Sequence, residues 1–298
     1  MSKPTVSLLI TDLDNTLYDW VTYFASAFSA MVSKAVEILH IPYAQLLDEL
    51  QTIHKLHHNS EHPFALLEIA SVKVQFGHLT RRERQVLLDD AFHAFNKTRK
   101  ATLKLYEGVQ ETLGLVCMNG CPIVAHTEAT VPNAMFRIKS LGLYQYLNRL
   151  YALEPTGQGH PDPEREEFLM PDPNFVSLVP RSQRKPSPEL ILNICSYYGV
   201  PPSQAVYVGD SLTRDISMAK QAGVWSVWAR YGTEYSREDW AKLVRVTHWS
   251  GEDVNRETEL SSRYSSIRPD VELSRFEQLV GNFSFTKPSS SALLTSVR

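Results

Sequence analysis

The 298-residue sequence contains no apolar run that approaches the roughly 20 residues needed to span a bilayer as a helix. It also has no marked excess of either charge, because its formal net charge is −3. A chain without a strongly basic balance is not typical of proteins that bind nucleic acids or membrane surfaces. We therefore expect neither partner, and nothing in the composition indicates the oligomeric state.

Cysteine is also scarce. The chain has three cysteines, and an odd number fits reduced thiols better than a set of disulfides. The first residues carry one lysine and a short apolar run that leads into acidic residues, which is the pattern of neither a signal peptide nor a transit peptide. These observations predict a cytoplasmic location. The spacing of Cys117 and Cys121 does not match the usual zinc-binding pairs, so we expect buried structural thiols.

The remaining composition is that of an ordinary globular protein, with 43% hydrophobic and 21% charged residues. The length favours about two domains. Short apolar runs predict buried strands, and the segments between several of them have the periodicity or the end signals of helices. The predicted strands cover residues 6–10, 122–126, 150–153, 205–208, 225–229 and, at an edge, 245–249. The predicted helices of this part cover residues 109–119, 131–141, 188–198, 214–222 and 273–280.

Strands that alternate with helices form a parallel sheet with helices on both faces. The sequence therefore predicts an α/β fold with a doubly wound, Rossmann-like parallel sheet. We assign residues 1–16 and 105–285 to this core domain.

Two parts of the chain lack such regularity. Residues 154–184 are rich in proline and charge, and we expect an irregular insertion in the core domain. Within it, residues 168–170 and 175–179 are candidate short strands. Residues 286–298 are rich in serine without periodicity, and we expect a disordered tail.

A long helical segment separates the first predicted strand from the second. Residues 17–104 contain no convincing strand, whereas apolar side chains such as Phe24, Phe28 and Met31 recur at helical spacing. Thr80 and Glu83 have the spacing of a capping box at the start of a helix. We therefore predict a separate α-helical domain over residues 17–104, inserted after the first strand.

Four histidines, His54, His57, His58 and His62, lie in this helical segment. The first three would share one face of a helix, because they are spaced three and four residues apart. A zinc site would explain them, but no acidic or cysteine residue is adjacent in the sequence. A polar face near a functional site is the favoured interpretation.

The most informative stretch is Asp12-Leu13-Asp14-Asn15-Thr16, which follows the first predicted strand. Two carboxylates two residues apart in an extended chain point the same way. Like charges this close resist joint ionisation. A divalent cation would remove the conflict, and Mg²⁺ prefers oxygen ligands. The structural alternative is a turn rich in Asp and Asn after a strand.

Other polar residues lie at comparable places. Thr127 ends the second predicted strand, Lys185 precedes a helix, and Asp210 and Asp215 follow the fourth strand. Ligands bind at the carboxyl ends of parallel strands in open α/β sheets. Each residue also has a structural alternative: a helix cap for Thr127, a solvated lysine, a turn for Asp210, and a cap or dipole partner for Asp215. Together, their types and order are highly specific.

These clusters resemble, in the same order, the four motifs of the haloacid dehalogenase-like hydrolase superfamily. The similarity covers residues 4–16 and 105–230, and the helical insertion resembles the helical cap of that family. The resemblance implies that Asp12 is a nucleophile that forms an aspartyl-phosphate. It also implies that Asp14 is the general acid/base and offers its main-chain carbonyl to Mg²⁺.

The same resemblance implies roles for the other motifs. Thr127 and Lys185 would bind the phosphoryl oxygens, and Asp210 would be a metal ligand. Asp215 would orient Lys185 or a water molecule on the metal. One residue departs from the family pattern, because Glu128 follows Thr127 where relatives often have a small residue or asparagine. A carboxylate there must turn away from the phosphate or meet a cation.

The chemistry also follows from the residue types. A carboxylate can attack phosphorus and split one difficult displacement into two easier ones. A metal is needed to reduce the repulsion between this carboxylate and a phosphate dianion. Asp12 and Asp210 are therefore expected to face one cation. A second carboxylate, Asp14, can protonate the departing alkoxide and then activate water.

The sequence thus predicts a Mg²⁺-dependent phosphatase that acts on a small phosphorylated metabolite through an aspartyl-phosphate. The helical cap would exclude bulk water and select the leaving group. A phosphomutase or a dehalogenase of the same fold is the enzymatic alternative. A non-catalytic protein that binds or senses a phosphometabolite is the alternative from another class, because fold alone does not decide function.

Overall fold

The computed structural model describes residues 3–62, 64–155, 172–248 and 251–289. Within these residues, the centre of the fold is a sheet of seven parallel strands in the order β5-β4-β3-β2-β6-β7-β8. The strands are β2 (Leu8–Thr11), β3 (Ile123–Thr130), β4 (Arg149–Leu153), β5 (Val176–Val179), β6 (Ala205–Gly209), β7 (Trp225–Ala229) and β8 (Val271–Leu273). The first strand of the chain is therefore central in the sheet.

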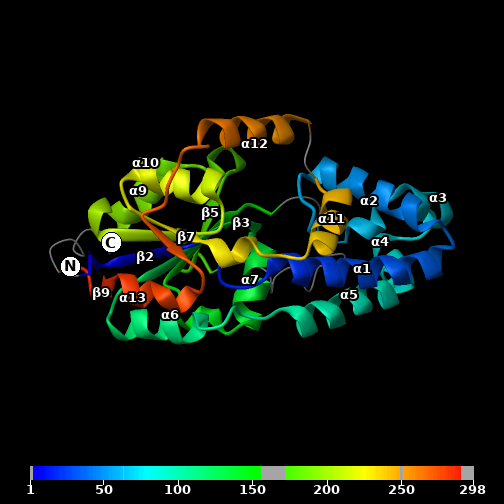
Figure 1. The fold of residues 1–298 in the computed structure, drawn as a ribbon. Coiled ribbons are helices and arrows are strands. Elements are labelled where there is room, and N and C mark those ends of the chain that lie inside the picture. Colours follow the sequence, from blue (N-terminus) through cyan, green and yellow to red (C-terminus); the bar gives the residue numbers. More distant parts are fainter. Residues whose placement is uncertain (1–2, 63, 156–171, 249–250, 290–298) are drawn as a thin grey trace.

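Helices cover both faces of this sheet (Figure 1). On one face lie α9 (Pro188–Tyr197) and α10 (Ser217–Ala222). On the other face lie α6 (Val109–Met118) and α13 (Leu279–Asn282). The helix α7 (Val131–Ser140) follows β3 directly.

The side chains of β2 explain this arrangement. Leu8 and Ile10 belong to a buried cluster with residues of α9 and α10, whereas Leu9 belongs to a cluster with residues of α6. Side chains alternate along a strand, so an apolar run buries both of its faces only when helices cover both. The predicted α/β fold with a doubly wound parallel sheet is confirmed.

Helices fill the segment between β2 and α6. They are α1 (Trp20–Leu39), α2 (Tyr43–His57), α3 (Ala70–Phe76), α4 (Arg81–Leu87) and α5 (Asp89–Thr102). Among the described residues of this segment, none adds a strand to the seven-stranded sheet. The Thr80–Glu83 capping box is present at the start of α4.

The two chain segments that join these helices to the sheet run side by side. The backbone amide of Tyr106 donates to the carbonyl of Leu17 at 2.9 Å. The hydrophobic cluster on the α6 side of the sheet also continues into α1, α2 and α5. The boundaries of a separate helical domain over residues 17–104 remain a prediction.

No single helix among the described residues is long and apolar enough to cross a membrane. By length and composition alone, α1 and α2 taken together would be long and apolar enough, although the chain bends by 115° between them. Ten residues of α1 are buried within the protein, which is how an apolar helix of a folded core also behaves.

A second helical segment lies between β7 and β8. It contains α11 (Arg237–Arg245) and α12 (Gly251–Arg263). Figure 1 shows α11 beside α1 and α2, far along the molecule from the strand that precedes it, and α12 above the sheet. Direct contacts join α11 to α1. The segment thus connects the sheet with the helices inserted after β2.

Several sequence-based boundaries are corrected by the structure. The predicted strand over residues 245–249 is wrong, because Arg245 ends α11 and the described residues that follow form a turn and a loop. The edge strand is instead β8. The predicted helix over 273–280 starts too early, since Leu273 ends β8 and α13 begins at Leu279.

The two ends of the chain also differ from expectation. The strand predicted over residues 6–10 is divided at Ser7, so that β1 (Thr5–Val6) pairs with β9 (Ser284–Phe285) in a small separate sheet. Of the predicted disordered tail, Thr286 is bonded through its amide to the carbonyl of Val6. Residues 290–298 lie outside the described residues.

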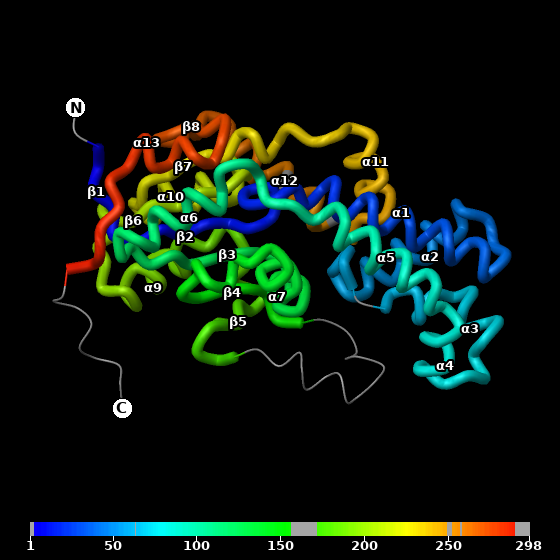
Figure 2. Tube along the Cα trace, turned by 90° about the horizontal axis from the view of Figure 1, so that it is seen from below, coloured from blue at the N-terminus to red at the C-terminus, as the bar shows by residue number. Residues whose placement is uncertain are grey.

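The expected irregular insertion over 154–184 is partly regular. Residues 176–179 form β5, an edge strand of the main sheet that pairs with β4. This agrees with the candidate strand at 175–179. The other candidate, residues 168–170, lies outside the described residues. Figure 2 shows β5 at the margin of the sheet, next to β4.

Candidate functional site

The predicted site residues gather at the carboxyl ends of three neighbouring strands. Asp12 directly follows β2, and Asp210 directly follows β6, the neighbour of β2. Thr127 lies in β3, the other neighbour, beyond the residues that pair with β2. The chain runs from β3 outward to β5 and returns to β6, so β2 and β6 mark the switch point of the sheet.

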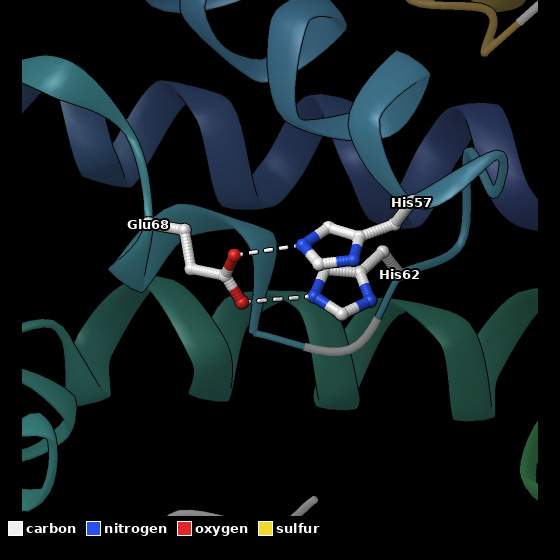
Figure 3. A group of neighbouring side chains, drawn as sticks. All are labelled: His57, His62 and Glu68. Carbon is white, nitrogen blue, oxygen red and sulfur yellow. Dashed lines mark hydrogen bonds and ion pairs between the residues drawn. The ribbon is translucent and has the colours of Figure 1, made fainter. Parts of the chain in front are cut away.

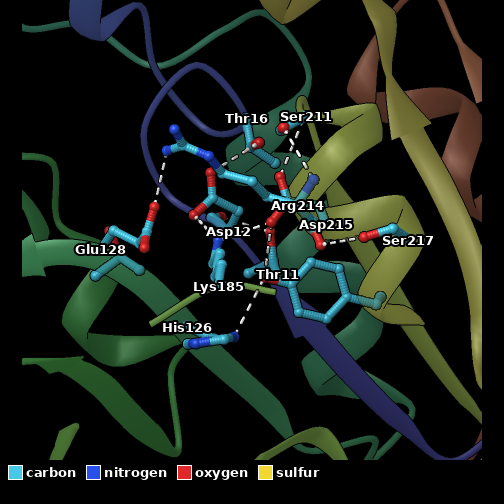
Figure 4. Close-up of polar contacts among 12 residues, drawn as sticks. Thr11, Asp12, Thr16, His126, Glu128, Lys185, Ser211, Arg214, Asp215 and Ser217 are labelled. Carbon is cyan, nitrogen blue, oxygen red and sulfur yellow. Dashed lines mark hydrogen bonds and ion pairs between the residues drawn. The ribbon is translucent and has the colours of Figure 1, made fainter. Parts of the chain in front are cut away.

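Lys185 joins two of the aspartates (Figure 4). Its ammonium donates to Asp12 Oδ1 at 2.6 Å and to Asp215 Oδ1 at 2.8 Å. Asp215 also accepts from the hydroxyl of Tyr207 at 3.2 Å and from the amide of Ser211 at 3.1 Å. Asp215 is therefore fixed by three donors and positions the lysine, a role consistent with one of those implied by the resemblance.

Burial governs the electrostatics of this group. It raises the pKa of Asp12 to about 7, although the neighbouring Lys185 ammonium opposes the change. Burial, together with Asp12, raises the pKa of Asp210 well above its usual value. Burial alone would lower the pKa of Lys185, but Asp12 and Asp215 outweigh it and raise that pKa. The lysine is thus held as a cation, while the crowded Asp12 and Asp210 carboxyls keep their protons to a higher pH than isolated ones.

A divalent cation fits this arrangement. One carboxylate oxygen from each of Asp12, Asp210 and Asp215 lies within 4.8 Å of the others. The donors are hard oxygens, which suit Mg²⁺ and similar ions. The group can therefore hold a divalent metal. Both oxygens of Asp215 already accept hydrogen bonds, from Lys185 and from the amide of Ser211.

Two glycines permit the close packing around these carboxylates. A Cβ at Gly209 would lie 2.4 Å from the carboxyl carbon of Asp215. A Cβ at Gly232 would lie 1.7 Å from the carbonyl oxygen of Asn15. Only a residue without a side chain lets the backbone approach so closely at both positions.

The Asp14 carboxylate is not part of the acidic group formed by Asp12, Asp210 and Asp215. It accepts from Arg137 Nη1 at 2.6 Å, and the other end of the Arg137 guanidinium binds Glu61. Arg137 is 1% exposed and comes from α7. Trp20 Nε1 also donates to Glu61. Arg137 and Glu61, which were not predicted from the sequence, connect the carboxylate of Asp14 to the helical segment.

We expect Arg137→Met to destabilise the protein strongly. The substitution leaves two largely buried carboxylates, Asp14 and Glu61, without their cation, and breaking such a pair costs about 3–5 kcal/mol of unfolding free energy. Urea denaturation measures the change. The control is Arg245→Met on α11, because Arg245 pairs with Asp48 at the exposed surface and should cost less than about 1 kcal/mol. Equal losses for the two variants would contradict this assignment.

Glu128, the departure from the family pattern, meets a cation of the protein itself. Its Oε2 accepts from Arg214 Nη1 at 2.9 Å, as Figure 4 shows. Arg214 lies in η6 (Leu212–Ile216), between Asp210 and Asp215. The negative charge of Glu128 is therefore offset before any ligand binds.

Thr127 is buried, and its hydroxyl accepts from the amide of Ala129 at 3.1 Å. A second threonine, Thr16, ends the motif that begins at Asp12, and no role was predicted for it from the sequence. Its hydroxyl donates to Asp12 Oδ2 at 3.4 Å, so it contacts the carboxylate oxygen that Lys185 does not bind.

These side chains open onto one large cavity of about 750 Å³. All six predicted site residues line it: Asp12, Asp14, Thr127, Lys185, Asp210 and Asp215. Part of its lining is apolar and comes from two helices, with Trp20 and Phe24 of α1 and Trp240, Leu243 and Val244 of α11. The structure therefore brings together polar groups predicted from widely separated parts of the chain.

Comparison with known proteins agrees with this arrangement. The family model of the haloacid dehalogenase-like hydrolases matches residues 6–170, which is more than half of the chain. A second model, described as HAD-hydrolase-like, matches residues 182–255. The chain belongs to the haloacid dehalogenase-like hydrolases.

Several curated relatives of this hydrolase are phosphatases, two of which show how far the similarity extends. Over 76% of the chain it is 26% identical to glyceraldehyde 3-phosphate phosphatase of Methanopyrus kandleri, of which 85% is covered. Over 43% of the chain it is 31% identical to N-acetylmuramic acid 6-phosphate phosphatase of Pseudomonas aeruginosa, of which 56% is covered.

A solved structure shows the same fold. The 2-haloacid dehalogenase of Pseudomonas syringae pv. tomato matches 93% of the hydrolase with a TM-score of 0.56 and 20% identity, and 97% of that chain is covered. At this identity the likeness concerns the fold alone.

The histidines of the helical segment do not form one polar face. His54 is buried and bonds through Nδ1 to the carbonyl of Val246 at 2.8 Å. His57 and His62 stack on each other, with ring centroids 3.8 Å apart. Their Nε2 atoms bond to the two carboxylate oxygens of Glu68 at 2.7 and 3.0 Å (Figure 3).

Glu68 is therefore the acidic partner of these two histidines, which the neighbouring residues in the sequence did not reveal. The three ligand atoms lie within 4.8 Å of one another, which a metal ion would require. However, both Nε2 atoms are already bonded to the carboxylate, and the buried Nδ1 of His62 has no hydrogen-bond partner among the described residues. Metal-binding histidines usually donate through the second nitrogen. We interpret the group as a structural link between α2 and the loop that follows.

Proposed function

We propose that this hydrolase is a Mg²⁺-dependent phosphatase of small phosphomonoesters. The observation that carries the proposal is that Asp12 and Asp14 line one cavity together with Lys185 and Asp210. A protein that only binds phosphate needs a cation to hold it, but it does not need a second carboxylate, Asp14, in the same cavity as Asp12. The phosphatases among its relatives support the same reaction class.

The first step would be attack of an Asp12 carboxylate oxygen on phosphorus. The bond between phosphorus and the leaving oxygen breaks as the bond to Asp12 forms, which gives an aspartyl-phosphate. Lys185 and Thr127 line the cavity beside Asp12, where an ammonium and a hydroxyl can stabilise charge on the phosphoryl oxygens. When bound, Mg²⁺ would reduce the repulsion between nucleophile and phosphate, held by Asp12, Asp210 and the Asp14 carbonyl.

Asp14 would move the protons. Its carboxyl donates a proton to the leaving alkoxide, and then takes one from the water that attacks the aspartyl-phosphate. Inorganic phosphate leaves and Asp12 is restored. Cleavage of a carbon–halogen bond does not need the first of these proton transfers, so the presence of Asp14 favours phosphoester hydrolysis over dehalogenation.

We also propose that residues 17–104 act as a cap domain over this site. The side-by-side linkers at Leu17 and Tyr106 and the α1 residues in the cavity wall support a unit that moves over the sheet. Such closure would exclude bulk water and favour a small metabolite over a phosphoprotein. The three free cysteines support action in the cytoplasm, where thiols stay reduced.

Metal removal tests the proposal directly. We expect a panel of phosphorylated metabolites to contain substrates that are hydrolysed with Mg²⁺ and not after treatment with EDTA, because Asp12 and Asp210 need the cation. Release of inorganic phosphate is the measurement. Restored turnover on adding Mg²⁺ back, but not Ca²⁺, which prefers more ligands and longer distances, is the control.

If no phosphomonoester is hydrolysed under any metal condition, the phosphatase proposal is wrong. Saturable binding of a phosphometabolite without turnover would then favour the non-catalytic alternative. Turnover that is unchanged by EDTA would contradict the metal assignment alone.

A further inference from the structure

The cavity at the candidate site has a part that the proposed chemistry does not use. Its volume is about 750 Å³, and a phosphoryl group beside Asp12 would fill only a fraction of it. The polar residues of the site come from the carboxyl ends of strands, whereas other lining residues come from α1, α11 and α12. Their effect would be on the rest of the substrate, which is the leaving group.

The helix α11 turns one apolar face to this cavity. Trp240, Leu243 and Val244 all line it, and their spacing of three and four residues places them on one side of the helix. Because α11 contacts α1, the same lining includes Trp20 and Phe24. The segment between β7 and β8 thus contributes to the cavity together with the helices inserted after β2.

Packing between the helices does not account for all of these apolar side chains. Leu243 is 7% exposed and belongs to the hydrophobic core, as expected for a contact between α11 and α1. Trp240, Val244 and Val254 of α12 also line the cavity, but they are 38%, 51% and 50% exposed. None of the three belongs to either hydrophobic cluster of the described residues. Their apolar surface therefore remains available to a ligand.

The aromatic rings of the lining are held in place by one another. Tyr235 and Trp240 stack with their ring centroids 4.9 Å apart, and Trp20 and Phe24 stack at 5.5 Å. The indole N–H of Trp20 also donates to Glu61. Rings that are already fixed lose little freedom when an apolar group binds against them, so more of the burial energy appears as affinity.

Polar side chains in the same lining are largely occupied by the protein. The hydroxyl of Ser60 and Nδ1 of His248 are hydrogen-bonded at 2.8 Å, and the hydroxyl of Thr233 donates to the carbonyl of Arg230 at 2.8 Å. The buried amide nitrogen of Asn59 has no hydrogen-bond partner among the described residues. One such donor is too few for a polyol, because each buried hydroxyl of a ligand needs a partner.

We propose that this part of the cavity binds an apolar leaving group of ring size, so that the substrates are phosphomonoesters of apolar alcohols such as arylalkyl alcohols. The inference rests on the proposed phosphatase function and narrows its substrate class. Trp240 and Val244 are then specificity-determining residues, because the leaving group covers their exposed apolar surface and releases water from it.

The test compares matched substrates. Phenylethyl, phenylpropyl and phenylbutyl phosphate are each paired with the alkyl phosphate of the same chain length, and a hexose phosphate esterified at its primary hydroxyl represents a polar ring. All are esters of primary alcohols, so the chemical step is similar. We expect wild-type kcat/KM to be at least about 10-fold higher for the phenyl member at the chain length that reaches α11, the effect of burying a ring the size of the Phe side chain. The hexose phosphate should show no such gain.

Variants then locate the preference. Trp240→Ser should lower the phenylalkyl-to-alkyl ratio by about 10-fold and Val244→Ser by about 3-fold, and Trp240→Phe should retain most of it. The control is Val86→Ser, which changes an exposed valine of α4 outside the lining and should leave the ratio unchanged. Thermal melting confirms folding, and if Trp240→Ser does not fold, Val244→Ser decides.

Binding provides a readout that does not depend on turnover. Calorimetric titration with the matching phosphonates, which cannot be hydrolysed, should give the same ratio in Kd. The heat capacity change of binding should be more negative for the phenyl members, because burial of apolar surface has that signature.

Two results would overturn the proposal: a wild-type ratio near one in both kcat/KM and Kd, or a ratio that Trp240→Ser and Val244→Ser both leave intact. A hexose phosphate that is hydrolysed as well as the best phenylalkyl phosphate would overturn it too. Hydrolysis of any of these esters would show that the phosphatase proposal survives such a failure. Preferential binding of phenylalkyl phosphonates without hydrolysis of any ester would instead refute the phosphatase and leave the apolar site standing.

Discussion

Asp12→Asn is expected to abolish turnover and to prevent formation of a phosphoenzyme. The amide keeps the shape of the side chain but is a poor nucleophile, and it weakens the metal site and the ion pair with Lys185. Removal of a covalent nucleophile should cost at least about 10⁴-fold in kcat, because only binding and electrostatic effects remain. Phosphate release and intact-mass detection of a phosphoryl adduct after acid quenching measure the two effects.

The matched control is Asp48→Asn, which changes an exposed carboxylate on α2 in the same way. It should form the adduct and turn over as the wild type does. A phosphoryl adduct that persists in Asp12→Asn would mean that another residue is the nucleophile. Wild-type turnover without any adduct would instead favour direct attack by water.

The strand ends that carry the candidate site could be predicted from the sequence because they depend on local patterns. A short apolar run, followed by Asp12 and Asp14, identifies a buried strand and what lies at its end. The rule that ligands bind at the carboxyl ends of parallel strands then places Asp12 and Asp210 at one edge of the sheet. That β6 lies directly beside β2 does not follow from the order of the strands in the chain, and the closeness of the two residues was expected from the family resemblance.

The role of Arg137 could not be predicted in this way. On α7 it reads as an ordinary polar residue of an amphipathic helix, yet it is buried with partners 123 and 76 residues away in the sequence. Such a pairing depends on how the inserted helices pack against the sheet. Buried ion pairs are poorly predicted from sequence because local periodicity says nothing about distant partners.

The position of α11 was missed for a related reason, although one signal existed. Ser236 caps the helix by accepting from the amide of Asp239, and acidic residues follow in the first turn. This signal predicts a helix start near residue 237 and argues against a strand that begins at 245. The contact of α11 with α1 is a tertiary feature that the capping signal could not supply.

Asp14→Asn should separate the two proton-transfer steps from the attack on phosphorus. The main-chain carbonyl remains, so most of the metal affinity should remain, but the proton donor and base are lost. Turnover of an alkyl phosphate should fall by about 10²–10⁴-fold, the usual contribution of a positioned acid/base. The loss should be smaller for an aryl phosphate, because a leaving group of low pKa needs less protonation.

The same substitution also removes a partner of Arg137, so stability must be measured beside activity. Glu61 still binds the guanidinium, and the variant should therefore fold. If the base is lost while the nucleophile is intact, the aspartyl-phosphate formed from an aryl phosphate should accumulate and be visible by intact mass. Wild-type rates on both substrates would show that Asp14 is not the acid/base. Equal losses on both, with normal stability, would indicate that its main role is to position the site through Arg137, because a general acid must discriminate between leaving groups.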